Sequence, residues 1–171
     1  MILSREEILE RIKKYNLIED FLNLDKQLQP ASFDLTLREV YDLKTSGQID
    51  FSNQERKLPN LEKIKFKHGW LKLKQGCYLI TFNEIVNVPN DLMAFLRPRS
   101  SLVRMGATVV SSLWDPGYQG RSNSLLVVFN KNGIKIKENA RIAQFVFLKL
   151  KKPTRHLYSG IYKGENISKL S

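Results

Sequence analysis

The apolar residues of the chain follow two different spacings, one near the N-terminus and one through the rest. Between residues 8 and 15 apolar side chains recur every three or four positions, as on one face of an α-helix. Ser4 and Glu7 precede this pattern with the spacing of a capping box, in which the two side chains bond free backbone N–H groups. The pattern predicts a short amphipathic helix over residues 5–14.

After Pro30 apolar and polar residues alternate with a period of two, which is typical of strands with one buried face. Turn signals rich in Gly, Pro and Asn separate the segments. Many short strands with one helix predict an all-β sandwich or barrel, and the polar stretch 45–60 predicts a long loop. The alternating segments are 33–37, 71–73, 77–81, 84–88, 93–96, 107–111, 125–129 and 141–148.

Length and composition narrow the class of protein. A chain of 171 residues with 42% hydrophobic residues suits one compact domain with a real core. The single cysteine, Cys77, excludes an internal disulfide framework, and two distant histidines, His68 and His156, make a zinc cluster improbable. No apolar run approaches the roughly 20 residues of a membrane span, and the acidic N-terminus is unlike a signal peptide. We expect a cytoplasmic protein without membrane association.

The net charge of +11 is concentrated near the C-terminus. Residues 131–171 hold ten basic and two acidic side chains, a local charge of +8. Such a surface attracts polyanions, including nucleic acid and nucleotide polyphosphates. The alternative is a lysine-rich solvated surface, and charge alone does not separate the two interpretations.

The motifs that are absent also restrict the chemistry. The sequence contains no P-loop, no His-Glu-x-x-His and no Gly-x-Ser-x-Gly motif. Two histidines are too few to favour a Ser-His-Asp triad. Any hydrolysis should therefore use a carboxylate base, basic and hydroxyl groups that bind an anion, and an exogenous cation.

Three clusters have this composition. Residues 29–35 place Asp34 among apolar residues at a strand start. This carboxylate either has a functional role or is satisfied by hydrogen bonds from local backbone donors. Residues 97–104 combine three arginines with two serines, a composition suited to phosphate but also found on ordinary surface loops. In residues 114–120, Pro and Gly predict a tight turn that brings Asp115 close to Tyr118, although a plain hairpin turn would have the same sequence.

Taken in order, four motifs resemble those of the trimeric dUTPases. They are Pro-Ala-Ser-Phe-Asp-Leu (30–35), Pro-Arg-Ser-Ser-Leu (98–102), Trp-Asp-Pro-Gly-Tyr-Gln-Gly (114–120) and Arg-Ile-Ala-Gln (141–144). The Met-Ile-Leu-Ser and Gln-Pro-Ala-Ser segments resemble the deaminase-like branch that includes archaeal dUTPases. The resemblance covers roughly residues 1–162.

The resemblance implies a distorted β-barrel or jelly-roll domain over residues 1–157 and a flexible tail, 158–171, that closes over the active site. It also implies a homotrimer with active sites at subunit interfaces, Mg²⁺ bound to the triphosphate of dUTP, and no requirement for nucleic acid. The product dUMP would supply dTMP synthesis, and removal of dUTP would limit uracil in DNA.

The resemblance also implies a role for each matching residue. Asp115 would be the general base, Tyr118 would pack under the deoxyribose and exclude a 2′-hydroxyl, and Asp34 would bind the magnesium waters. The remaining expected contacts to substrate come from Arg99, Ser100 and Ser101 on the phosphates, Gln144 on the phosphates or the neighbouring site, Arg104 on phosphate or in the trimer, Ser111 within a backbone segment that reads uracil, Tyr158 and Tyr162 on the base, and Lys163 on the γ-phosphate.

Two other functions stay open. In dCTP deaminases, which share this fold, a glutamate on the strand after the Asp-Pro-Gly turn activates water; Leu125 or Val127 stands at that place here. A deaminase or bifunctional enzyme is therefore disfavoured, although the tail from Tyr158 to Asn166 looks deaminase-like. A non-catalytic nucleotide- or nucleic-acid-binding module is the third interpretation. The residues Arg121 to Asn123 look like a short insertion for which the sequence offers no explanation.

Overall fold

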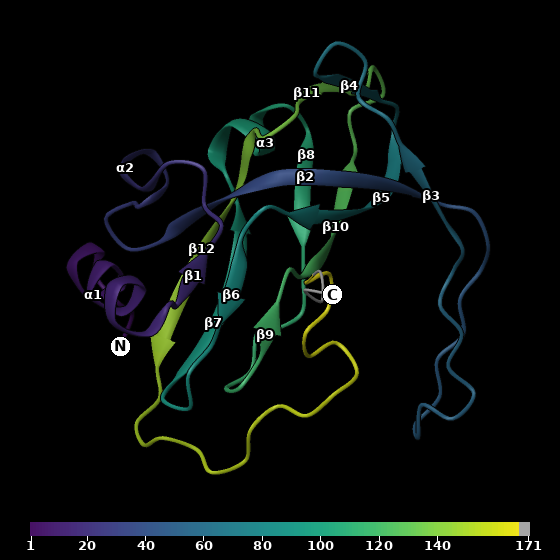
Figure 1. Cartoon of the computed structure of the whole chain (residues 1–171). Coiled ribbons are helices and arrows are strands. Elements are labelled where there is room, and N and C mark those ends of the chain that lie inside the picture. The colour runs from purple at the N-terminus through teal and green to yellow at the C-terminus, as the bar shows by residue number, and fades with distance from the viewer. Residues whose placement is uncertain (168–171) are drawn as a thin grey trace.

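The computed structural model describes residues 1–167 and consists mainly of β-strands (Figure 1). The helices are α1 (Arg5–Tyr15), α2 (Leu24–Gln27) and α3 (Ser100–Arg104). The strands are β1 (Ile18–Glu19), β2 (Phe33–Leu43), β3 (Leu61–Ile64), β4 (Trp70–Leu73), β5 (Gly76–Phe82), β6 (Ile85–Asn87), β7 (Leu92–Pro98), β8 (Ala107–Val110), β9 (Gln119–Gly120), β10 (Asn123–Val128), β11 (Ile134–Lys137) and β12 (Arg141–Lys149).

The N-terminal helix forms as its sequence predicts. The Ser4 hydroxyl accepts a hydrogen bond from the backbone of Glu7, whose side chain accepts one from the backbone N–H of Ser4. Ile8 and Ile12 face the core, and Asn16 ends the helix in the left-handed conformation. Two short helices, α2 and α3, are additions that the apolar spacing did not predict.

The main sheet almost closes on itself. Its antiparallel order is β7–β12–β2–β5–β10–β8, with β3 added beside β2. Beyond the end of β8, Trp114 exchanges two backbone hydrogen bonds with Ala94 of β7, at N–O distances of 2.9 and 3.0 Å. The two edges of the sheet therefore meet, which removes most unpaired edge groups. The predicted all-β, barrel-like fold is confirmed.

Aromatic side chains fill the inside of the barrel. Phe145 of β12 packs edge to face against Trp114 and Phe147, with ring centroids 4.6 and 5.0 Å apart. Phe33 and Phe82 are completely buried beside them in the same core. Pairs of this geometry add about 0.5–1.5 kcal/mol to the stabilisation from burial. Trp114 is thereby fixed, and with it the chain that leads into the next turn.

The first half of β2 departs from simple alternation, because Asp34 and Thr36 are buried along with their apolar neighbours. The buried carboxylate of Glu84 accepts hydrogen bonds from the backbone N–H and hydroxyl of Thr36, at 2.9 and 2.6 Å. The amide of Gln27 donates to Glu84 at 2.7 Å and to the carbonyl oxygen of Asp34 at 2.9 Å. This network ties α2 to β2 at the position of Asp34, and burial raises the pKa of Glu84.

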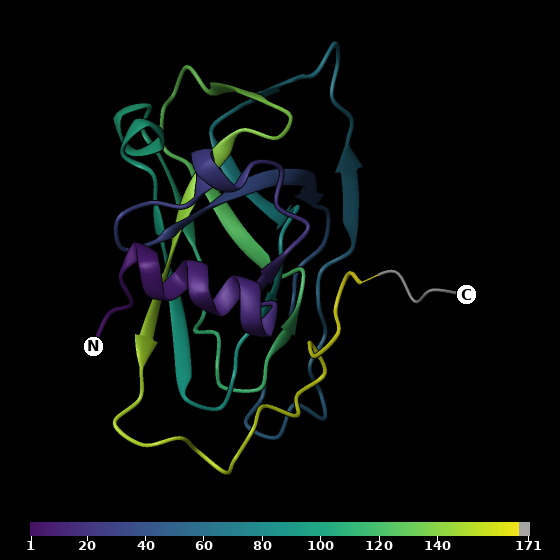
Figure 2. The same ribbon diagram turned by 60° about the vertical axis from the view of Figure 1, so that its left-hand side comes forward.

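Two segments extend from the barrel. The predicted loop 45–60 projects to one side (Figure 1), and Gln48 and Lys57 exchange backbone hydrogen bonds of 2.8 and 2.9 Å across it. After β12 the chain runs below the barrel and returns upward toward β9 (Figure 2). No helix among the described residues is long and apolar enough to cross a membrane.

Candidate active site

The turn after Trp114 holds Asp115 and Tyr118 in a fixed relation. The backbone N–H of Tyr118 donates to the carbonyl oxygen of Asp115 at 3.1 Å, Pro116 occupies the second position, and Gly117 has φ +89°. Pro followed by a residue with positive φ defines a type II turn. The predicted tight turn is confirmed, and glycine is required because a Cβ at position 117 would lie 2.7 Å from the Cβ of Leu157.

Asp115 projects into solvent at the edge of two pockets. One, of about 490 Å³, is also lined by Tyr118, Tyr158 and Glu165. The other, of about 530 Å³, is lined by Asp115 together with His156. The Asp115 carboxylate is exposed and makes no hydrogen bond within residues 1–167. A carboxylate without a partner in the protein is free to bind a water molecule and act as a general base.

The C-terminal segment covers Tyr118. The Tyr118 hydroxyl donates a 2.8 Å hydrogen bond to Oε1 of Glu165, and the tyrosine is only 6% exposed. Burial, reinforced by the Glu165 charge, raises the pKa of Tyr118, and burial also raises the pKa of Glu165. Glu165 is a second carboxylate in the pocket, and no pattern in the sequence assigned it there.

Backbone hydrogen bonds hold this segment in place. Tyr158 donates to the carbonyl oxygen of Pro116 at 2.8 Å, and its ring lies 5.9 Å from that of Tyr118. Further along, the N–H of Gly164 donates to the carbonyl oxygen of Gln119 at 2.7 Å. Residues 158–167 therefore pack on the turn of their own chain. The flexibility expected of the tail stays a prediction, and residues 168–171 lie outside the described part.

The three residues that looked like an insertion support this packing. The backbone N–H of Arg121 donates to the carbonyl oxygen of Glu165 at 3.0 Å, while its guanidinium pairs with Asp20. Ser122 is buried, and Asn123 begins β10 and accepts a 3.1 Å hydrogen bond from Asn166. The segment thus provides the surface on which the C-terminal residues lie.

A second cluster surrounds the fully buried carboxylate of Asp34. Its Oδ2 lies 3.1 Å from Nε of Arg99 and 3.3 Å from a terminal nitrogen of Arg141. Oδ1 has no hydrogen-bond partner within residues 1–167. Burial raises the pKa of Asp34, and the two guanidiniums act in the opposite direction. Two arginines, rather than local backbone donors, are thus the partners of this carboxylate.

The other predicted phosphate contacts lie near this cluster. Ser100 and Ser101 form the exposed first turn of α3, directly after Arg99, and Arg104 is exposed at its end. Gln144 stands opposite Asp34 in the β2–β12 register, with its amide 3.5 Å from the hydroxyl of Ser32. Hydroxyl, amide and guanidinium donors therefore gather at one end of β12, a composition suited to phosphate oxygens.

The residues around Asp34 do not form a magnesium site of their own. The unpaired Oδ1 is buried, and the other oxygen lies against two guanidiniums that repel a cation. Among residues 1–167 there is no group of three His, Cys, Asp or Glu side chains able to hold a metal ion. Magnesium prefers oxygen ligands and keeps several waters, so a cation would have to come with an anionic substrate. The contact between Asp34 and magnesium waters stays a prediction.

The two clusters lie at different levels of the same strand, β7. Trp114, next to Asp115, pairs with Ala94, whereas Arg99 directly follows the end of β7. Arg99 lies five residue steps of extended chain beyond Ala94, which corresponds to about 16 Å. Figure 1 shows the same separation, with α3 near the top of the barrel and β9 below. One chain does not bring Asp115 next to the arginines.

The remaining predicted residues divide between the two sides of the turn. Ser111 was expected to end a strand over residues 107–111, but the observed strand β8 ends one residue earlier, and Ser111 is half-buried just beyond it. Tyr162 lines the same pocket as Asp115, with the guanidinium of Arg56 5.8 Å from its ring. Lys163 instead borders a hollow beside Tyr15, so the structure does not place it in the Asp115 pocket.

Comparison with known proteins connects this geometry to a family. The family profile described as dCTP deaminase-like matches residues 2–150. The chain belongs to the dCTP deaminase-like family. Within this family, the chain is 49% identical over 166 residues to the probable deoxyuridine 5′-triphosphate nucleotidohydrolase of Archaeoglobus fulgidus, covering 97% of this chain and 98% of that protein.

Other dCTP deaminase-like relatives carry two different activities in their names. The deoxyuridine 5′-triphosphate nucleotidohydrolase of Methanocaldococcus jannaschii is 42% identical over 147 residues, 84% of this chain and 92% of that one. The dUMP-forming dCTP deaminase of Persephonella marina is 32% identical over 178 residues, 96% and 93% of the two chains. Relatives of this chain are thus named both as hydrolases and as deaminases.

A solved structure supports the family's fold. The 2′-deoxycytidine 5′-triphosphate deaminase of Agrobacterium tumefaciens matches with a TM-score of 0.63 and 23% identity, over 87% of this chain. The match covers 47% of that structure, so this chain spans about half of its length. The similarity establishes that the two share the barrel.

Proposed function

We propose that this chain hydrolyses dUTP, supplied as its magnesium complex, to dUMP and pyrophosphate. The observation that carries the proposal is the unpaired, exposed carboxylate of Asp115, held by a rigid turn at the edge of a pocket. The names of relatives up to 49% identical over nearly the whole chain support the same substrate. In a cell, the reaction would limit uracil in DNA and supply dUMP for dTMP synthesis.

In the proposed reaction Asp115 takes a proton from a water molecule as that water attacks the α-phosphorus. The bond from the α-phosphorus to the bridging oxygen of the β-phosphate breaks, pyrophosphate leaves, and the new oxygen stays on dUMP. Arg99, Ser100 and Ser101 hold the phosphate oxygens and stabilise the charge that develops on the leaving group.

The nucleoside would occupy the pocket beside Tyr118. Within residues 1–167, the backbone groups of Ser111, Ser112 and Leu113 make no hydrogen bond, so they remain available to a uracil edge. The Tyr118 ring would lie under the deoxyribose and leave no room for a 2′-hydroxyl. Because Glu165 covers this ring, the nucleotide must displace the C-terminal segment from it. Tyr158 and Tyr162 of the displaced segment would then stack on the base.

The complete site is proposed to form between subunits of a homotrimer. The supporting argument is the level difference of about 16 Å, within one chain, between Arg99 and the Ala94 position beside Asp115, because both groups must reach a single triphosphate. Sedimentation should give three chains per particle. Asp115→Asn and Arg99→Ala subunits, each inactive alone, should recover part of their activity when mixed; no recovery would place both groups in one chain.

A substrate panel in water enriched in ¹⁸O tests the reaction. Pyrophosphate should form from dUTP and not from UTP, with the label in dUMP. Label in pyrophosphate would mean that water attacks a different phosphorus. Ammonia from dCTP would support the deaminase alternative, which needs a proton-transfer group that neither Leu125 nor Val127 of β10 provides. No product from any nucleotide would favour a binding module.

A further inference from the structure

The two-stranded ribbon of β4 and β11 has one buried and one exposed face. Figure 1 shows it at the upper end of the molecule, and β9 and the C-terminal segment lie at the other end. The ribbon's inward side chains are apolar and anchor it to the barrel. They are Leu71, Leu73, Ile134 and Ile136, each at most 6% exposed.

The outward face carries a tryptophan among lysines. In the antiparallel register Lys72 stands opposite Lys135, and Trp70 stands opposite Lys137. Like charges directly opposite one another destabilise a sheet. None of these three lysines forms an ion pair within residues 1–167. The ribbon therefore has a concentrated positive charge that no ion pair with the described residues neutralises.

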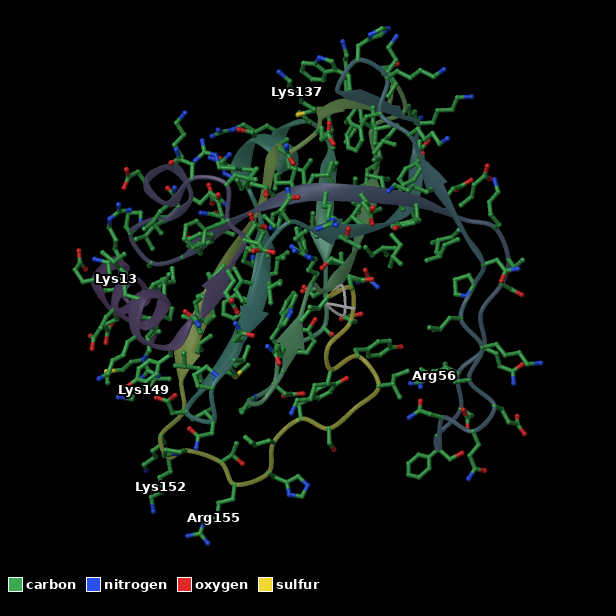
Figure 3. The ribbon with its side chains drawn as sticks, viewed as in Figure 1. Lys13, Arg56, Lys137, Lys149, Lys152 and Arg155 are labelled. Carbon is green, nitrogen blue, oxygen red and sulfur yellow. The ribbon has the colours of Figure 1, made fainter. Side chains whose placement is uncertain are left out.

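A pocket of about 530 Å³ extends this face. Trp70 lines it together with Lys65, Lys67, Lys72 and Lys135. Lys137, labelled in Figure 3, stands at the same upper edge of the molecule. These five lysines and Trp70 define the ribbon patch. A row of cations beside an exposed aromatic ring is the combination that binds phosphodiesters and stacks bases.

Trp70 is the more accessible of the two tryptophans. It is 38% exposed, whereas Trp114 is buried in the core. In the free chain the ammonium of Lys135 lies 4.5 Å from the centroid of the Trp70 ring, and that of Lys137 lies 5.9 Å away. Exposed cation–π contacts of this kind are weak. The ammonium groups can move to phosphates and leave the ring face to a base.

We propose that the ribbon patch binds single-stranded nucleic acid, with its lysines on successive phosphates and one base stacked on Trp70. A single strand fits better than a duplex because its bases are already free to stack on a side chain. The patch uses none of the residues assigned to dUTP hydrolysis. The proposal is therefore independent of that reaction.

The test measures anisotropy of a fluorescein-labelled oligothymidylate of about 20 nucleotides with the full chain, from about 50 to 200 mM salt. Lys72→Glu with Lys135→Glu should weaken binding at least about tenfold and flatten the salt dependence. Lys152→Glu with Arg155→Glu is the matched control, because it changes the net charge equally at a distant basic surface labelled in Figure 3. The control should weaken binding far less.

Trp70→Ala tests the stacked base. It should weaken oligothymidylate binding about tenfold and leave the binding of inorganic polyphosphate unchanged. Unchanged dUTP hydrolysis and melting temperature show that each variant is folded. Equal losses in the ribbon and control variants, tighter binding of duplex than of single strand, or binding indifferent to Trp70 would each overturn the proposal.

Discussion

The hydrogen bond between Glu165 and Tyr118 should set how firmly the C-terminal segment docks on the turn. The two oxygens are 2.8 Å apart, and hydrogen bonds to charged groups contribute about 1.5–3 kcal/mol. Desolvation of the half-buried carboxylate, which raises its pKa, offsets part of this stabilisation. We expect Glu165→Ala to weaken docking by about 1 kcal/mol, or about fivefold in the ratio of docked to undocked segment.

Glu165→Gln provides a matched comparison because it keeps an acceptor for the Tyr118 hydroxyl but carries no charge. The raised pKa means that the docked segment holds a proton more tightly than the undocked one. Docking should therefore be strongest below the ordinary carboxyl pKa and should weaken as pH rises through the raised value. The glutamine variant should lose this pH dependence and dock at least as firmly near neutral pH.

Hydrogen exchange measured by mass spectrometry reports docking directly. The amide of Gly164, bonded to Gln119, and the amide of Arg121, bonded to the carbonyl oxygen of Glu165, should exchange faster in Glu165→Ala. Glu138→Ala, which removes an exposed carboxylate on the far end of the barrel, is the control. Equal exchange in the alanine variant and the wild type would refute the assigned role of Glu165.

Three further substitutions test the site and its support. Glu84→Ala leaves three buried donors without an acceptor and should lower the free energy of unfolding in urea by about 3 kcal/mol; a loss below about 1 kcal/mol would contradict the network. Gly117→Ala places a side chain at a positive φ and against Leu157. Its kcat for dUTP should fall even at temperatures well below its melting temperature, where the variant is folded. An unchanged kcat would show that the turn does not position the base. Asp34→Asn removes the charge that orients Arg99, so KM for dUTP should rise about tenfold; an unchanged KM would disconnect this pair from phosphate binding.

Local patterns predicted much of the fold. The helix α1 and the longer strands repeat one spacing over enough residues to reveal their buried faces. The two-residue strands β1 and β9 are too short to show alternation, and β3 and β11 were also missed. The buried Asp34 and Thr36 are bonded by Gln27 of α2, seven positions before Asp34, and by Glu84, 48 positions after Thr36, and the alternation within β2 signals neither partner.

The candidate site likewise has features that the sequence predicted and features that it did not. The turn at Asp115 was predictable because proline fixes its own φ and glycine tolerates the positive φ that this turn requires. The partners of Asp34 were not, since Arg99 and Arg141 reach it only when β2, β7 and β12 assemble. The contact from Glu165 to Tyr118 spans 47 positions and leaves no local signal.

The role of Asp115 is the central claim, and single-turnover hydrolysis of saturating magnesium–dUTP by Asp115→Asn tests it most directly. Asparagine keeps the shape of the side chain but cannot accept the proton from water. The rate of dUMP formation should fall about 10²–10⁴-fold while dUTP still binds, measured by equilibrium titration. A variant that hydrolyses dUTP at the wild-type rate would contradict the assignment of Asp115 as the general base.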